Sequence, residues 1–235
     1  VSHFCKKDST VHFEGKVWKM KGRIVESIFA IGMSPFLMNL AACFIVIIIN
    51  QGLKKYGGDL AIGAFGIVNR LVFIVVMIVM GLNQGMQPIA GYNFGAKLYG
   101  RVNKVLRLTI IYATAVTTFG FLVGMLVPDL VVGIFTSDAE LTELSVTGLR
   151  ITVMFFPIIG FQMVTSNFFQ SIGMAGKAIF LSLTRQMLIL LPCLLVLPQF
   201  FGVAGVWYSM PVSDLLASLI ALVMLVCQFR KFRTS

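Results

Sequence analysis

Long apolar segments alternate with short polar breaks along the chain from about residue 25 onward. The apolar runs are roughly 20 to 30 residues long, the length that a helix needs to cross about 30 Å of hydrocarbon at 1.5 Å per residue. Barrel strands would alternate over about ten residues, which these runs do not. The pattern predicts an all-α membrane protein in which six transmembrane helices form one bundle, over about 25–50, 60–90, 105–127, 139–172, 178–200 and 203–228.

Polar segments lie on either side of the predicted bundle of residues 25–229. Residues 1–24 combine basic and apolar side chains, which is typical either of an amphipathic segment on the inner leaflet or of a solvated linker. Residues 230–235 form a basic tail. Between the third and fourth spans, the spacing of Ser137 and Glu140 is that of a capping box at the start of a helix.

Composition strengthens the membrane interpretation. The chain is 58% hydrophobic and 12% charged with a mean hydropathy of +0.93, values that a soluble core with a solvated face does not reach. The net charge of +10 follows topology, because fourteen of the nineteen basic residues fall in cytoplasmic segments if both termini are cytoplasmic. The lipid bilayer, not a nucleic acid, is thus the expected partner, and the expected location is the plasma membrane. The external loops then hold Lys54, Lys55, Asp59, Asp129, Asp138, Glu140 and Glu143.

Signatures of soluble enzymes and of ATP-driven pumps are missing from the sequence. There is no phosphate-binding Gly-rich loop with Lys-Ser/Thr and no His-Glu-x-x-His, and the two histidines, His3 and His12, lie before the first span. The four cysteines are far apart. We therefore expect no catalytic residue, no metal site and no cofactor, so that any transport would use a proton or sodium gradient.

Asp214 is the acidic residue that stands out within the spans, because a charge at the helix centre costs about 2.5 to 3.5 kcal/mol unless it is paired or wetted. It follows Trp207 by seven residues, which places it roughly 10 Å below the outer aromatic belt. Asp214 is predicted either to bind a proton or cation during transport or to be a static partner for an arginine or hydroxyl on another helix.

Other polar residues in the spans are open to two interpretations. Arg70, Arg150 and Arg185 lie close enough to a membrane face to snorkel, which is favoured over contact with a substrate. Uncharged polar side chains either tie helices together or line a cavity with methionines and phenylalanines. The cavity candidates are Asn39, Asn69, Gln84, Gln162, Asn167 and Gln170.

Five prolines interrupt four of the predicted spans. Each removes a backbone donor and frees a carbonyl, which predicts a local kink and, taken together, a protein that bends around a cavity. The prolines are Pro35, Pro157, Pro192, Pro198 and Pro211.

The second predicted span ends in a run rich in Gly, Gln and Asn that insertion into a membrane does not require. Its sequence fills the pattern QG-x-QP-x-x-GYN-x-GA without a gap and resembles the multidrug and toxic compound extrusion family, as does the closing stretch from Gly205 to Asp214. The motif residues are Gln84, Gly85, Gln87, Pro88, Gly91, Tyr92, Asn93, Gly95 and Ala96.

The resemblance covers essentially the whole chain and implies a function. Members of the family have twelve spans in two bundles and export cationic or amphipathic small molecules in exchange for protons or sodium by alternating access. Since the chain begins at Val1 without methionine, it looks like the carboxyl-terminal lobe, whose partner is a missing N-terminal half. One branch of the family carries an acid in the middle of its seventh helix, but the corresponding stretch here, residues 39–43, has none, which argues against a cation site there.

Three alternatives remain open. A lipid-linked sugar flippase of the same superfamily would need a larger and more cationic cavity than three peripheral arginines indicate. A membrane-embedded enzyme would need clustered catalytic groups near one face, of which only Asp214 is visible. A structural scaffold is the third.

Overall fold

The computed structural model describes residues 22–233, without the side chains of several residues between 23 and 35 and of residues 229–233. The segment before residue 22, which includes most of the predicted linker, and the last two residues of the tail lie outside this part. The chain divides into two units, Val1–Asn39 and Leu40–Ser235. Of the first unit, residues 22–39 are described and are helical. The packing and the site described below belong to the second unit.

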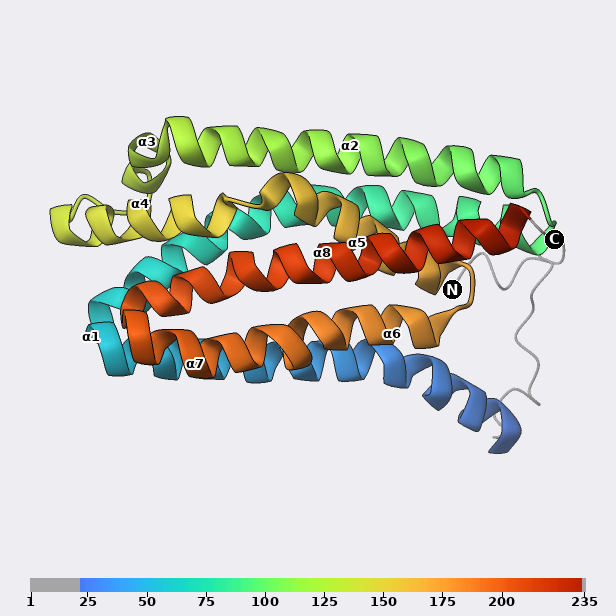
Figure 1. Cartoon of the computed structure of the whole chain (residues 1–235), viewed down its shortest axis with the longest axis horizontal. Coiled ribbons are helices and arrows are strands. Elements are labelled where there is room, and N and C mark those ends of the chain that lie inside the picture. The colour runs from blue at the N-terminus through green and yellow to red at the C-terminus, as the bar shows by residue number, and fades with distance from the viewer. Residues whose placement is uncertain (1–21, 234–235) are drawn as a thin grey trace, which may run out of the picture. The chain divides into compact units, whose positions relative to one another are not determined.

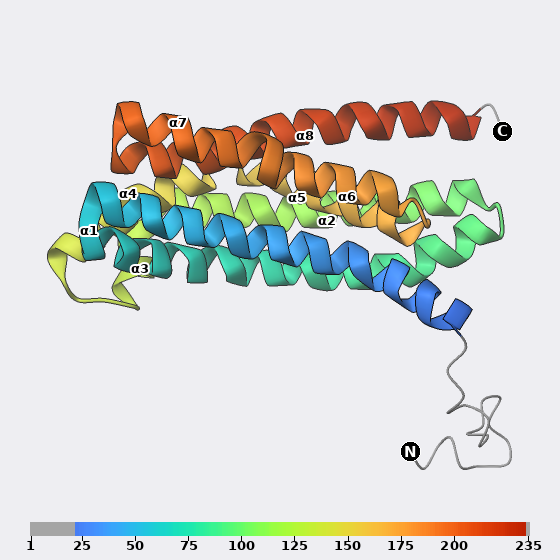
Figure 2. The ribbon, with the colours of Figure 1, turned by 90° about the horizontal axis from the view of Figure 1, so that it is seen from below.

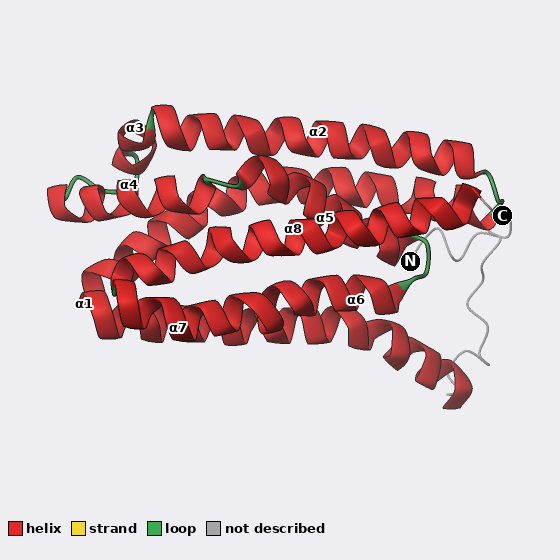
Figure 3. Cartoon of the chain, in the orientation of Figure 1, coloured by secondary structure: helices red, strands yellow, loops and turns green. Residues whose placement is uncertain are grey.

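Helices make up nearly all of the described residues, and no strand occurs among them (Figure 3). Within residues 22–233, four helices are long and apolar enough to cross a membrane, and a bent pair of shorter helices forms a fifth candidate. The prediction of an all-α membrane protein is therefore confirmed. The helices are α1 (Gly22–Gly95), α2 (Tyr99–Leu126), α3 (Pro128–Gly133), α4 (Ala139–Val153), α5 (Phe156–Ser171), α6 (Ala175–Leu183), the π-helix η2 (Thr184–Leu190), α7 (Leu191–Phe201) and α8 (Val203–Arg233).

Helix α1 is too long to be one crossing, and it is broken at Gly58. This glycine has φ 67° and ψ −161°, a conformation outside the helical region that side chains disfavour. Figures 1 and 2 show that residues 59–95 return in the direction opposite to residues 40–57. Counted as two arms, α1 and the other four candidates accommodate the six crossings that hydropathy predicts.

Proline causes the break between α4 and α5. Pro157 has no N–H to donate to the carbonyl of Val153, and its ring crowds that carbonyl, so α4 ends at Val153 and the chain bends by 55° before α5 continues. The predicted span over 139–172 is thus two helices. The predicted capping box is wrong by one residue, because the carboxylate of Asp138 accepts the Leu141 N–H at 2.9 Å and so caps α4.

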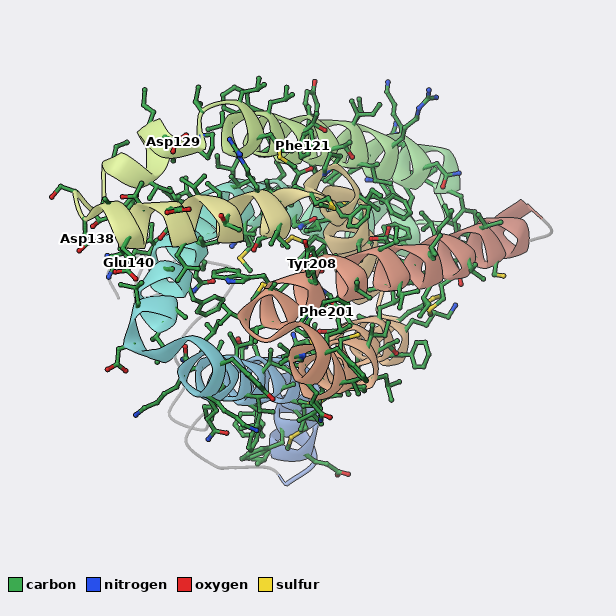
Figure 4. The ribbon with its side chains drawn as sticks, turned by 60° about the vertical axis from the view of Figure 1, so that its left-hand side comes forward. Phe121, Asp129, Asp138, Glu140, Phe201 and Tyr208 are labelled. Atoms are coloured by element: carbon green, nitrogen blue, oxygen red, sulfur yellow. The ribbon has the colours of Figure 1, made fainter. Side chains whose placement is uncertain are left out.

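The two ends of the second unit differ in charge. The Gly58 turn, α3, the start of α4 and the α7–α8 turn lie at one end, whereas the α1–α2 and α5–α6 turns lie at the other (Figures 1 and 2). Figure 4 shows Asp129, Asp138 and Glu140 around α3 and the start of α4. The opposite end carries the basic residues Lys97, Arg101, Lys104 and Lys177. This separation is what the positive-inside rule describes.

Helix α8 is held against α4 by a tryptophan that fits over a glycine. Trp207 is buried, and its ring centroid lies 5.9 Å from that of Phe65 on α1. A Cβ on Gly148 would lie 2.6 Å from the nearest atom of the Trp207 ring, closer than atoms can pack. The missing side chain of Gly148 therefore sets the distance between α4 and α8.

Replacing Gly148 by alanine is expected to destabilise the protein by about 1–3 kcal/mol, because overpacking outweighs the gain in helix propensity. The matched control is Gly66→Ala in α1, where a Cβ would meet no atom within 4 Å. That variant should be neutral or slightly stabilised. Apparent melting temperatures from circular dichroism in detergent measure both effects, and equal melting temperatures for the two variants would contradict this packing.

Candidate functional site

A cavity of about 400 Å³ opens among α1, α4, α5, η2 and α8. Its volume falls within the range of small-molecule sites, roughly 300–1,000 Å³. Like such sites, it has apolar walls with a few polar groups. The polar residues in its wall are Asn69, Thr152, Arg185, Ser213 and Asp214. Aromatic and sulfur side chains supply much of the rest, namely Phe65, Phe73, Phe156, Met80, Met163 and Met210.

Arg185 and Asp214 form an ion pair in the wall of this cavity. Both Nε and Nη2 of Arg185 lie 2.7 Å from the same carboxylate oxygen, Oδ1 of Asp214. The Asp214 side chain is 6% exposed, but that of Arg185 is 32% exposed. The pair therefore joins a buried anion to a cation that reaches the open space of the cavity.

The two charges lie on neighbouring helices that differ in their local geometry. Asp214 lies on α8, where the hydroxyls of Ser213 and Ser218 donate to backbone carbonyls of the same helix and not to the carboxylate. Arg185 lies on η2, in which the backbone N–H of Leu191 donates to the carbonyl of Gln186, five residues earlier. Pro192 comes next and cannot donate to the carbonyl of Leu188, so the helix widens ahead of it.

The structure bears on the interpretations given above for Asp214 and for the three arginines. Asp214 does have an arginine partner on a neighbouring helix, as the static interpretation expects. The structure differs from the expectation that Arg185 snorkels: its side chain lines the cavity and forms an ion pair with the buried carboxylate of Asp214. Arg70 and Arg150 are exposed.

The six cavity candidates lie in different surroundings. Asn69 lines the cavity, Gln162 is buried, and Gln84 and Gln170 are exposed. Asn167 donates to the carbonyl of Met163 at 2.9 Å and accepts a hydrogen bond from Gln87, which makes it a link between helices. Asn39 is the last residue of the first unit, whereas the cavity is built from residues of the second.

Sequence reasoning did not identify Thr152, Ser213 or Arg185 as residues of the cavity wall. Hydroxyl residues are common on membrane helices and carry no distinguishing signal. For Arg185 the sequence does contain a signal. Arg185 and Asp214 lie in consecutive spans, and neither has a residue of opposite charge within its own span, which makes the two natural partners.

The family-like motif lies at the end of α1 and joins it to the end of α5. Gln87 Nε2 donates to Asn167 Oδ1 at 3.3 Å, and a Cβ on Gly91 would lie 2.9 Å from the backbone oxygen of Ser171. Asn93 Nδ2 donates to the carbonyl of Ile89 at 2.8 Å. Tyr92 is 78% exposed. The contacts of Gln87, Gly91 and Asn93 are thus structural.

The same motif ends the helix in a specific way. The N–H of Leu98 donates to the carbonyl of Asn93 and that of Lys97 to Phe94, while Lys97 adopts φ 58°, which is the Schellman arrangement. Helix α5 ends in the same way, with Gly173 at φ 77° and the N–H of Met174 bonded to Phe169. Both turns therefore reverse the chain with the same geometry.

An all-helical membrane protein with broken helices around a cavity, and with a charge pair in the cavity wall, has the features of a membrane transporter. The family model described as MatE matches residues 31–195, well over half of the chain. The chain therefore belongs to the multidrug and toxic compound extrusion (MATE) family, whose members are transporters and not enzymes.

Known relatives agree with this assignment. The chain is 28% identical over 222 residues to the multidrug export protein MepA of Staphylococcus aureus strain MSSA476, covering 94% of this chain and 49% of MepA. MepA of Staphylococcus haemolyticus strain JCSC1435 is 26% identical, with coverages of 94% and 48%. The chain thus spans about half the length of the curated relatives that it matches.

Solved structures match the fold over a similar share. The MATE multidrug transporter DinF-BH in complex with rhodamine 6G has a TM-score of 0.81 at 35% identity, covering 94% of this chain and 49% of that one. An outward-facing MATE transporter matches with a TM-score of 0.87 and an inward-facing one with 0.83, each at 18% identity. These two cover 99% and 100% of this chain, and 52% and 54% of the respective structures.

We expect Arg185→Gln to lower the free energy of unfolding by about 3 kcal/mol or more, because it leaves the Asp214 carboxylate buried without a partner. Asp214→Asn should cost less, about 1 kcal/mol, since Arg185 is partly exposed and can reach water. The double variant should recover part of the loss. Unfolding by SDS in mixed micelles measures this double-mutant cycle, and strictly additive losses would show that the two charges do not stabilise each other.

Proposed function

We propose that the chain is the carboxyl-terminal lobe of a MATE efflux transporter that exports cationic or amphipathic compounds by alternating access. The observation that carries the proposal is the cavity, whose apolar and aromatic wall contains one buried carboxylate, Asp214. Methionine and phenylalanine side chains accept varied apolar shapes, and the carboxylate attracts positive charge. The export function named for MepA and the rhodamine 6G complex of DinF-BH support this proposal.

The proposed topology has six crossings over the segments given above, with both ends of the chain in the cytoplasm and the protein in the plasma membrane. The acidic end, with Asp129 and Asp138, would face outward, and the basic end, with Lys97 and Arg101, would face the cytoplasm. A second six-helix lobe, which precedes this one in the full-length protein, would complete the transport pathway. The length of the relatives supports that arrangement, because this chain covers about half of each.

Asp214 is proposed to be the group of this lobe that responds to the driving ion or to the substrate. It is the acidic residue in the cavity wall, and a carboxylate there can exchange one positive charge for another, whether a proton, sodium or an organic cation. Asn69 and Thr152 would supply neutral contacts. The flippase alternative gains no support, because Arg185 is paired with Asp214 and the lining residues carry no net charge.

Asp214→Asn should reduce gradient-driven efflux at least about tenfold, equivalent to about 1.4 kcal/mol, because an amide neither holds a cation nor takes up a proton. The measurement is efflux of rhodamine 6G from proteoliposomes of the full-length protein under imposed proton or sodium gradients. Asp129→Asn makes the same chemical change at an exposed position and should leave efflux intact. Unchanged efflux in folded Asp214→Asn under both gradients would remove Asp214 from the mechanism.

A further inference from the structure

The carboxylate of Asp214 already has a cationic partner within the protein, the guanidinium of Arg185. Two nitrogens of the Arg185 guanidinium converge on Oδ1 of Asp214, as an organic ammonium or guanidinium ligand would. The other cavity-lining residues are uncharged. An incoming cation therefore meets a carboxylate that is neutralised.

We infer that Arg185 is a tethered cation that occupies the Asp214 site between transport events, so that a cationic ligand binds by exchanging with it. The inference rests on the proposed function, since it assumes that cations enter this cavity. A carboxylate on a side chain that is only 6% exposed is stable only with a positive partner. Exchange keeps one cation on Asp214 at all times and so avoids a bare buried charge.

The structure leaves Arg185 free enough to depart. Its side chain lines the cavity and is 32% exposed, whereas that of Asp214 is 6% exposed, so the arginine is the member of the pair that has room to move. Among the described residues, Nη1 of Arg185 makes no hydrogen bond, and neither charged group has a hydrogen bond or ion pair with any side chain other than its partner. The guanidinium is thus held by one carboxylate oxygen.

The helix that carries Arg185 is also poised to rearrange. Arg185 is the second residue of η2, and the side-chain oxygens of its two neighbours, Thr184 and Gln186, are buried without hydrogen-bond partners among the described residues. Rewinding a π-helical turn into α-helix shifts the register by one residue and rotates the side chain by up to about 100°. Such a turn would carry Arg185 away from Asp214.

A pair of probes of equal size and opposite charge tests the exchange. Tetraphenylphosphonium is a lipophilic cation, and tetraphenylborate is the corresponding anion. If competition with the Arg185 guanidinium weakens cation binding to Asp214 about tenfold in wild type, Arg185→Gln should bind tetraphenylphosphonium about tenfold more tightly than wild type. Tetraphenylborate binding should not change, and Asp214→Asn should abolish the gain when combined with Arg185→Gln.

The experiment is a binding titration of the full-length protein in detergent, on the monodisperse fraction of each variant. Arg150→Gln, at an exposed arginine outside the cavity, is the matched control and should bind like wild type. If Arg185→Gln fails to fold, Arg185→Lys is tested in its place. Because the lysine ammonium makes fewer hydrogen bonds to Asp214 than the guanidinium, tetraphenylphosphonium binding should become about threefold tighter than in wild type. Unchanged or weaker cation binding by the folded variant overturns the inference, as does a loss of tetraphenylborate binding, which would make Arg185 an anion site.

Repeating the titration in sodium chloride and in potassium chloride identifies the competing cation. If sodium weakens tetraphenylphosphonium binding to Arg185→Gln, Asp214 also accepts the small ion; if it does not, the site takes organic cations. Both results place a cation on Asp214 in place of Arg185 and support the exchange. The test is independent of efflux: unchanged cation affinity in Arg185→Gln, with efflux that still requires Asp214, would contradict the exchange and leave the proposed function standing.

Discussion

The structure depends on the ion pair between Arg185 and Asp214, because a single unpaired charge inside a membrane protein is costly. The helices around the cavity hold the two side chains in contact. A bare Asp214 carboxylate would be costly because its side chain is only 6% exposed, and an unpaired Arg185 would be drawn toward a membrane face. The 2.7 Å contacts between them require η2 and α8 to lie side by side at matching depth. The packing of Trp207 on Gly148, which fixes α8 against α4, helps to keep α8 in place.

Several of the helices that border the cavity are interrupted. Gly58 divides α1, Pro157 separates α4 from α5, and Pro192 follows the widened turn that carries Arg185. The interruptions at Pro157 and Pro192 remove regular backbone hydrogen bonds within the bundle, which is tolerated at membrane depth only inside protein or beside a cavity. The bent and widened helices border the same cavity, which connects proline placement in the sequence with the site.

Much of the fold is predictable because hydropathy reports helix length directly. The runs of apolar residues, the basic and acidic ends, and the Gln84–Ala96 motif identify a helical membrane protein of one family without coordinates. The division of the 139–172 span is foreseeable only as a kink at Pro157, because sequence does not give the angle. The cap lies at Asp138 and not at Ser137, since both residues can accept the hydrogen bond and local backbone geometry chooses between them.

The site is less predictable, because pairing depends on the rotation of helices about their axes. Asp214 stands out by its charge alone, whereas the short distance of Arg185 from a turn suggests a place at the membrane face, and the π-helical widening changes where its side chain points. Asn167 has the polarity of a cavity residue and instead joins α5 to α1.

The most direct test of a cavity that opens to both sides is the reactivity of Asn69→Cys toward a membrane-impermeant maleimide, in full-length protein whose native cysteines have been replaced. Asn69 lies in the cavity wall, so its accessibility reports which side of the membrane the cavity faces. Alternating access predicts labelling from either side, depending on the direction of the imposed gradient, and protection by rhodamine 6G. Labelling from one side only, or none, would contradict it.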